Sequence, residues 1–331
     1  MAKKRVFQKA GDACYHCISR TVNGEFLLHS LEARGMLQKQ MQQIAEFCGV
    51  EIVTFCILSN HFHLLVRVPD KNRVRVSDEE LLRRFHVLYP NPTKYQRAGF
   101  RRLEEQLARG GVEAESVRQK LLRRMHDISE FMKTLKQRFS IWYNQTHDRF
   151  GTLWAERYKC VLVQGEGFPL LVTSLYIDLN PVRAGITADP KDYPFSGYAD
   201  AVAGRHKAIA GIKLACSGLL AKDISDEQVL AIYRMRLFGK GSRKAPGKPD
   251  ATIISREKAA EVIFSERGRL PMQDALRCRM RHFTDGIVLG DKRFVQEQIG
   301  KPALSEDTRV PGGDGFEQIH TAHRLRGQSV Y

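Results

Sequence analysis

Hydrophobic and polar positions alternate along several short stretches in the first third of the chain. Strand-like patterns, rich in β-branched residues, cover residues 13–22, 51–58 and 60–68. Between the first two, apolar residues recur near helical spacing from Ser30 to Cys48, and Gly49 is a natural end for that helix. The short turn at Ser59-Asn60 predicts that the second and third strands form a hairpin. The chain therefore begins as strand, helix, strand, strand.

The pattern changes at residue 70 and then supplies another helix and another strand. Residues 70–111 are polar and Arg-rich, and prolines and glycines interrupt them, which predicts an insertion of short helices. From Glu115 to Asn144 apolar residues step by three or four, which predicts one long helix. Residues 158–164 predict a fourth strand. This order is that of a ferredoxin-like split βαβ core, an α+β fold whose antiparallel sheet carries helices on one face.

The length and the later sequence suggest further parts. We expect residues 1–205 to form one domain that contains the insertion at about 70–112, and residues 206–300 to form a mainly helical C-terminal extension. Within the extension a capping box at Ser225 opens a helix, a flexible basic linker follows, and two or three short helices come next. The predicted segments after the capping box are 225–237, 239–250, 272–281 and 292–299. The extension is either a small helical DNA-binding module or a part that packs on the core. The Pro, Gly and charge content of residues 301–331 predicts a mostly disordered tail.

Charge and composition narrow the class of partner. The formal net charge is +16 and the pI is near 9.6, which favours a polyanion such as nucleic acid. No run of eighteen apolar residues occurs, so we expect no membrane span. The basic N-terminus lacks the apolar region of a secretory signal, which predicts a cytoplasmic protein. The seven cysteines are scattered, as expected of reduced thiols, and Cys14 and Cys17 lack a second pair that would complete a zinc site.

Two short patterns could carry chemistry. His61 and His63 stand two apart on a predicted strand, so their imidazoles point to one face while Phe62 points to the other. Two imidazoles begin a divalent metal site but do not complete it, and two histidines at a strand start near the surface are the alternative. Tyr176 and Asn180 stand four apart on a predicted helix. An amide oxygen is a hard metal ligand and a phenol can be a nucleophile, although a half-buried core tyrosine and a helix-terminal asparagine also fit.

Four segments together resemble the REP-associated tyrosine transposases, which are single-tyrosine HUH transposases. They are Tyr15–Gly24 (YHCISRTVNG), His61–His63 (HFH), Gly151–Lys159 (GTLWAERYK) and Tyr176–Gly185 (YIDLNPVRAG). The resemblance extends from about residue 6 to residue 198. It implies a ferredoxin-like core, a divalent metal (Mg²⁺ or Mn²⁺) held by His61 and His63 with Asn180 as third ligand, and Tyr176 as the nucleophile.

The activity that the resemblance implies is metal-dependent cleavage and rejoining of single-stranded or hairpin DNA through a covalent 5′-phosphotyrosine, as in DNA transposition. A homodimer is compatible with it, because some relatives act as dimers and others as monomers. The alternative is a domesticated, non-catalytic hairpin DNA- or RNA-binding protein, although such a descendant would be expected to lose the nucleophile or a ligand. Among the basic residues we expect Arg157, Lys159 and Arg183 to contact phosphates. Because histidines at a strand start add little core area, we expect their replacement to affect cleavage rather than stability.

Overall fold

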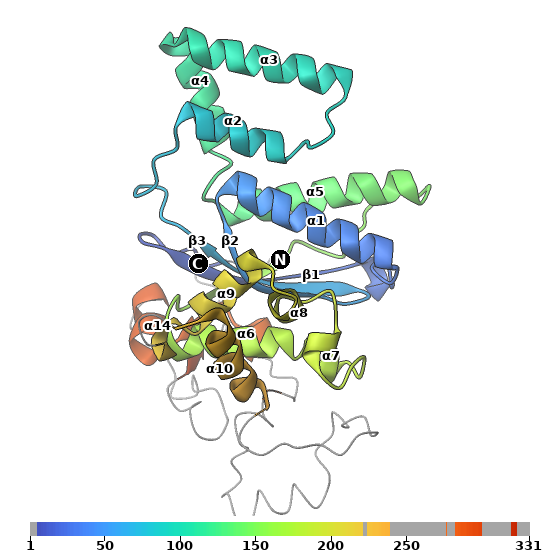
Figure 1. Ribbon diagram of the computed structural model, residues 1–331, viewed down its shortest axis with the longest axis vertical. Coiled ribbons are helices and arrows are strands. Elements are labelled where there is room, and N and C mark those ends of the chain that lie inside the picture. The colour runs from blue at the N-terminus through green and yellow to red at the C-terminus, as the bar shows by residue number, and fades with distance from the viewer. Residues whose placement is uncertain (1–4, 221–223, 239–275, 277–281, 300–318, 323–331) are drawn as a thin grey trace, which may run out of the picture.

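The computed structural model describes residues 5–220, 224–238, 276, 282–299 and 319–322 (Figure 1). Its centre is a six-stranded sheet in the order β2-β3-β1-β4-β5-β6. The first four strands along the chain are β1 (Ala13–Arg20), β2 (Glu51–Ile57), β3 (His61–Val68) and β4 (Lys159–Val163). They pair antiparallel throughout, as the predicted hairpin and the ferredoxin-like order require. The α+β fold class is confirmed.

One face of the sheet packs against α1 (Leu31–Cys48) and α5 (Ile128–Thr146). The Ser30 side chain accepts from Ala33 N–H at the start of α1, and Gly49 ends it with a φ of 63°, as predicted. Phe62 of β3 is fully buried on this face, with its ring centroid 5.7 Å from that of Trp154. Since successive strand residues alternate, His61 and His63 point to the other face.

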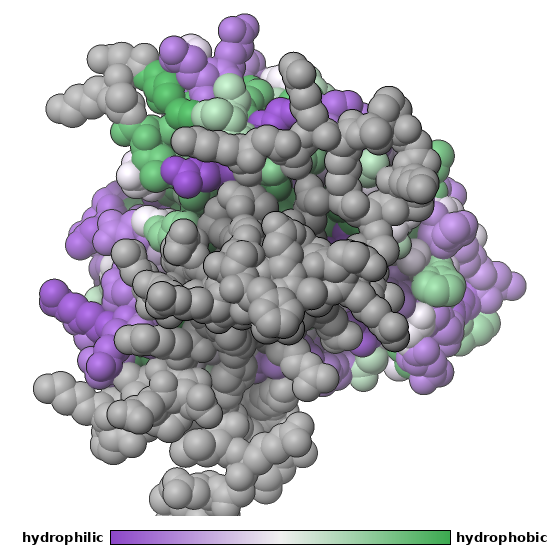
Figure 2. Space-filling model, turned by 90° about the horizontal axis from the view of Figure 1, so that it is seen from below, coloured by the Kyte–Doolittle hydropathy of each residue, from purple (hydrophilic) through white to green (hydrophobic). Residues whose placement is uncertain are grey.

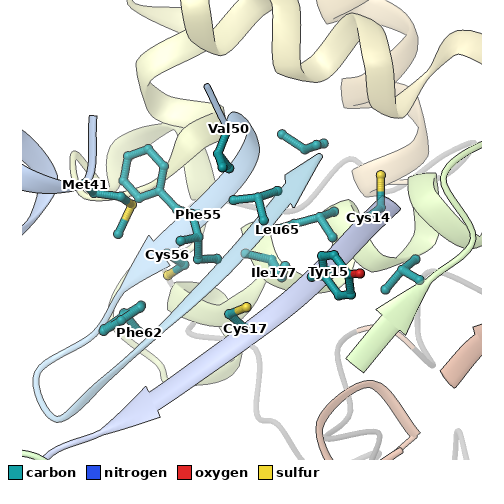
Figure 3. Close-up of a cluster of buried hydrophobic side chains, with 14 of the residues drawn as sticks. Cys14, Tyr15, Cys17, Met41, Val50, Phe55, Cys56, Phe62, Leu65 and Ile177 are labelled. Carbon is teal, nitrogen blue, oxygen red and sulfur yellow. The ribbon is translucent and has the colours of Figure 1, made fainter. Parts of the chain in front are cut away.

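The second face of the sheet is covered by α6 (Gly167–Asp178) and the helices after it, although the sequence pattern predicts helices on one face only. Residues 169–178 of α6 are all buried, so this helix is covered around its whole circumference. Figure 3 shows Ile177 of α6 among side chains of β1, β2 and β3. The later helices on this side are α7 (Asn180–Arg183), α8 (Gly197–Val202), α9 (His206–Ala215) and α10 (Asp226–Phe238).

A buried carboxyl group joins α6 to the sheet and to the C-terminal extension. Asp178 accepts from the Thr54 hydroxyl at 2.7 Å and from the Tyr233 hydroxyl of α10 at 2.5 Å. Burial raises the pKa of Asp178 to about 7, and the two hydrogen bonds oppose that rise. The start of α10 is the predicted capping box, in which Ser225 and Gln228 bond reciprocally. The described part of the extension thus packs on the core.

The single long helix predicted from Glu115 to Asn144 is wrong, because the chain breaks at residues 123–127. His126 adopts a left-handed φ of 51°, and its N–H donates to the Cys48 carbonyl at 2.7 Å. Asp127 then caps a new helix by accepting from the N–H groups of Ser129 and Glu130. A tertiary bond to the end of α1 and a local cap together outweigh the continuous apolar stripe.

The insertion consists of short helices, as predicted. They are α2 (Asp78–Val87), α3 (Lys94–Arg109) and α4 (Gly111–Leu122), and Figure 1 shows them beyond α1 and α5, on the far side from α6. Single turns of 3-10 helix occur at Val22–Gly24, Pro190–Asp192 and Ser217–Leu219. Among the described helices, none combines the length and the apolar character that crossing a bilayer demands.

The C-terminal part adds strands that the sequence pattern does not predict. Its elements are α13 (His282–Asp285), β5 (Val288–Gly290), α14 (Lys292–Ile299) and β6 (His320–Ala322). β5 runs parallel to β4, and β6 pairs antiparallel with β5. The segment 320–322 therefore corrects the prediction of a disordered tail, while α14 is confirmed. The predicted linker 239–250 and, apart from Leu276, the predicted helix 272–281 lie outside the described residues.

The cysteines are free and buried, as predicted for reduced thiols. This holds for all six that the structure describes, and Cys14 and Cys17 are each at most 1% exposed. Burial raises the pKa of Cys14 to about 12, so its thiol stays protonated at neutral pH.

Candidate active site

A pocket of about 300 Å³ lies where β1 ends and β3 begins. Its walls come from β3, the loop before β4, the α6–α7 junction and α13. It contains every residue singled out from the sequence, namely His61, His63, Arg157, Lys159, Tyr176, Asn180 and Arg183. A larger cavity of about 550 Å³ beside β2 and α9 contains none of them. The smaller pocket is therefore the candidate site.

The two histidines of β3 share one side of this pocket. Their ring centroids are 5.2 Å apart, as expected for alternate residues of a strand. Nδ1 of His61 lies 2.6 Å from Oδ1 of Asn60, and Nδ1 of His63 lies 2.9 Å from Nε2 of His16. Because protein atoms occupy both Nδ1 positions, Nε2 is the nitrogen with which each ring would bind a metal.

His16 is a member of the site that the sequence reasoning missed. It lies on β1, is fully buried, and stacks on His63 with ring centroids 5.1 Å apart. Its Nδ1 lies 2.8 Å from the carbonyl oxygen of Phe283 in α13. Burial lowers the pKa of His16 to about 4 and lowers that of His63 well below its usual value. The alternation of a strand predicts from the sequence that His16 and Arg20 share one face of β1. Only the pairing of β1 with β3 in the folded sheet brings His16 next to His63.

Tyr176 is 2% exposed and lies between aromatic neighbours. Its ring stacks on Phe283 at 4.6 Å and meets His63 edge-on at 6.3 Å between centroids. The guanidinium carbon of Arg183 lies 3.9 Å from its ring centroid, a cation–π contact. Asn180, one turn further along the chain, also lines the pocket. Tyr176 is thus held in a fixed orientation, with its ring part of the pocket wall.

The amide of Asn180 is oriented by the end of α6. Its Nδ2 donates to the carbonyl of Ile177 at 3.0 Å and to that of Tyr176 at 3.4 Å. These acceptors assign the nitrogen, so Oδ1 is the atom with which Asn180 would bind a metal. Asn180 therefore brings a hard oxygen to the pocket that the two imidazoles also line.

The donor set fits a divalent metal. Two imidazole nitrogens and one amide oxygen suit Mn²⁺, and with added water Mg²⁺. The described residues contain no group of three or more His, Cys, Asp or Glu side chains that could hold a metal. The third protein ligand would therefore be the neutral oxygen of Asn180.

The three basic residues differ in their surroundings. Arg157 is exposed at the rim of the pocket, and Lys159 pairs with Asp285 of α13 at 3.1 Å. Arg183 donates to the carbonyls of Tyr176 and Leu276, the latter at 2.6 Å. Arg183 thus already binds main-chain acceptors, one of them on Tyr176, whereas Arg157 is exposed to solvent.

The loop that carries Arg157 is anchored by the segment before it. Trp154 forms a β-bridge with Thr21 and donates from Nε1 to the carbonyl of Lys136 at 3.2 Å. Lys136 in turn donates from Nζ to the carbonyl of Glu156 at 2.7 Å. The GTLWAERYK segment therefore fixes the rim of the pocket to both β1 and α5.

Sequence comparison adds little, since no family model and no curated protein matches the chain. Among solved structures, the chain is similar to a REP-associated tyrosine transposase bound to a REP hairpin. The two are 16% identical, the TM-score is 0.39, and the match covers 61% of this chain and 86% of that one. At this identity and TM-score the similarity is too weak to assign a function.

Proposed function

We propose that this protein cleaves and rejoins single-stranded or hairpin DNA through a covalent bond to Tyr176, in the manner of the REP-associated tyrosine transposases that its motifs resemble. The observation that carries the proposal is the meeting of His61, His63, Asn180 and Tyr176 in one pocket, from β3 and the α6–α7 junction. Each pattern alone has a structural explanation. Their convergence on one 300 Å³ pocket favours chemistry.

The proposed reaction is a phosphoryl transfer. The phenol oxygen of Tyr176 forms a bond to phosphorus, and the bond from phosphorus to the 3′ oxygen breaks. The proton lost by the phenol balances the proton that the 3′ oxygen gains when it leaves as a hydroxyl. A divalent ion held by His61, His63 and Asn180 would act as a Lewis acid on the scissile phosphate. The phosphotyrosine keeps the energy of the phosphodiester, so a 3′-hydroxyl can attack it and rejoin strands without ATP.

The substrate class follows from access and charge. The ring of Tyr176 is almost completely buried, so the backbone that reaches it must be unpaired or at a hairpin end. The basic groups of the pocket and the net charge of +16 suit a phosphate backbone. Seen from below, many of the described residues on the surface are hydrophilic (Figure 2).

The decisive experiment uses a labelled hairpin oligonucleotide with a single-stranded tail, incubated with the full chain and Mn²⁺. We expect a labelled adduct that survives denaturing electrophoresis, together with a product that ends in a 3′-hydroxyl. A blunt duplex of the same composition should give no adduct. Cleavage that leaves no covalent species, or equal cleavage of the duplex, would overturn the proposal.

A second function is favoured by one observation. Phe283 stacks on Tyr176, which is 2% exposed, as expected if the chain binds hairpin DNA or RNA without cutting it. The same experiment separates the two functions. A complex on a native gel without any adduct on the denaturing gel would support the non-catalytic protein.

Arg157→Ala is expected to weaken binding of different tailed hairpins about equally. Loss of one phosphate contact should flatten the plot of log affinity against log salt by about 0.7. The check is fluorescence anisotropy over a range of salt concentrations. Arg109→Ala is the matched control, because Arg109 is 73% exposed on α3, outside the pocket, and should leave the slope unchanged. An unchanged slope for Arg157→Ala would exclude it as a phosphate contact.

Asp285→Asn is expected to raise affinity for the tailed hairpin by about two- to fivefold. Asp285 pairs with Lys159 inside the pocket, so it competes with phosphate for that cation, and exposed pairs contribute up to about 1 kcal/mol. Asp192→Asn is the control, because Asp192 pairs with Lys191 outside the pocket and should have no effect. Weaker binding by Asp285→Asn would mean that the carboxylate supports the DNA site instead of competing with it.

A further inference from the structure

Three groups form a hydrogen-bonded chain behind the candidate metal site. The carbonyl oxygen of Phe283 lies 2.8 Å from Nδ1 of His16, and Nε2 of His16 lies 2.9 Å from Nδ1 of His63. His16 is fully buried and His63 is 3% exposed, so bulk water does not compete for these nitrogens. The partners of each ring are therefore set by the protein.

The direction of each bond in this chain follows from the first acceptor. A carbonyl oxygen can only accept, so Nδ1 of His16 carries a hydrogen. Both rings are neutral, because His16 is fully buried and His63 is 3% exposed, and removal from water disfavours the charged imidazolium. A neutral imidazole has one N–H, so Nε2 of His16 accepts and Nδ1 of His63 donates. The single hydrogen of His63 is then on Nδ1, and its Nε2 carries a lone pair.

The strand register makes this chain possible. β1 and β3 pair with Ile18 opposite His63 and with His16 opposite Leu65. His16 is therefore the diagonal neighbour of His63 on the same face, within reach of a long or aromatic side chain. A slip of one residue would turn His16 to the other face and break the chain. The stacking of the two rings, 27° from parallel, adds a second restraint on His63.

We propose that His16 is a positioning residue that fixes the tautomer and orientation of His63, so that Nε2 of His63 is ready to bind a divalent metal. The inference rests on the metal site of the proposed function. It also assigns a role to the C-terminal part, because the carbonyl of Phe283 in α13 determines the tautomer of His16. Residues outside the stretch that resembles the transposases thereby take part in preparing the metal ligand.

The first test needs no substitution. The full chain is labelled with ¹⁵N-histidine, freed of metal, and examined by long-range ¹H–¹⁵N NMR, which distinguishes the two neutral tautomers. The expected result is a hydrogen on Nδ1 and a bare Nε2 for His63, with the same tautomer for His16. A hydrogen on Nε2 of His63 would overturn the proposal.

The second test measures Mn²⁺ binding by calorimetry without DNA. His16→Phe keeps a ring but removes both nitrogens, and it should weaken Mn²⁺ affinity by about 10- to 100-fold, the usual loss for an outer-shell partner. His16→Gln should recover part of that loss, because its Oε1 can accept from Nδ1 of His63. Cys17→Ala is the control, since Cys17 is equally buried on the opposite face of β1 and should leave affinity unchanged.

The outcomes separate this inference from the proposed function. Unchanged Mn²⁺ affinity in a folded His16→Phe variant, or an equal loss in Cys17→Ala, would overturn the role of His16. If the tautomers and Mn²⁺ binding are as expected but no DNA adduct forms, the positioning role is supported and the transposase reaction is not. Thermal unfolding of each variant shows whether the fold is intact before affinity is compared.

Discussion

Tyr176→Phe is expected to abolish the covalent protein–DNA adduct and to change hairpin affinity by no more than a few-fold. The phenol oxygen is the only atom removed, while the ring keeps its stacking on Phe283 and its cation–π contact with Arg183. The readout is the labelled species on a denaturing gel, with binding measured separately on a native gel.

Tyr143→Phe is the matched control for that experiment. Tyr143 is a buried tyrosine of α5 whose ring stacks on His147, and it does not line the pocket. This variant should form the adduct like the unchanged protein. An adduct that persists in Tyr176→Phe would show that another residue is the nucleophile.

His61→Ala is expected to reduce metal-dependent cleavage by about 100-fold or more, because loss of an outer-shell partner alone already costs 10- to 100-fold. His61 is half-buried at the start of β3, so thermal stability should change little. Initial rates at several Mn²⁺ concentrations measure the effect. His206→Ala, at an exposed position that begins α9, is the control.

Further conditions sharpen this test of the metal site. Cleavage should stop in EDTA, and Asn180→Ala should be milder than His61→Ala because water can replace a neutral oxygen ligand. Cleavage that proceeds equally well in EDTA would exclude the metal site.

The expectation that replacing either histidine leaves stability unchanged needs correction for His63. His63→Ala is therefore a poorer test of the metal site than the sequence suggests. His63 is 3% exposed and bonds to the buried His16, so alanine would leave Nε2 of His16 without its donor. An unpaired buried polar group costs about 1–3 kcal/mol. His61 is itself only half-buried, and its Nδ1 lies against the half-buried Asn60, which makes His61→Ala the cleaner substitution.

The parts of the site that lie close together along the chain could be predicted from the sequence. The period of two in a strand places His61 and His63 on one face and Phe62 in the core. The helical period places Asn180 one turn after Tyr176. The same local periodicities, with the stop at Gly49, give the strand and helix order of the ferredoxin-like core. These predictions succeed because each depends on backbone geometry over a few residues.

Local patterns fail where distant segments compete with them. The apolar stripe from Glu115 to Asn144 predicts an unbroken helix, but the hydrogen bond from His126 N–H to the Cys48 carbonyl breaks it. Sequence periodicity carries no information about so distant an acceptor. Likewise β5 and β6 have only three residues each, too few for the alternation of a strand to be recognised in the sequence. β5 and β6 form because the edge of β4 offers main-chain partners to short strands.

The sequence by itself therefore determined the four strands of the core, the helix that ends at Gly49, and the pairs His61–His63 and Tyr176–Asn180, since helix and strand periods are properties of the local backbone. The tertiary structure alone decided that the two pairs share one pocket, that His16 bonds to His63, and that Phe283 and Asp285 lie against Tyr176 and Lys159. Each of these depends on strand register or on the return of a distant segment, and both are set by side-chain packing across the whole sheet.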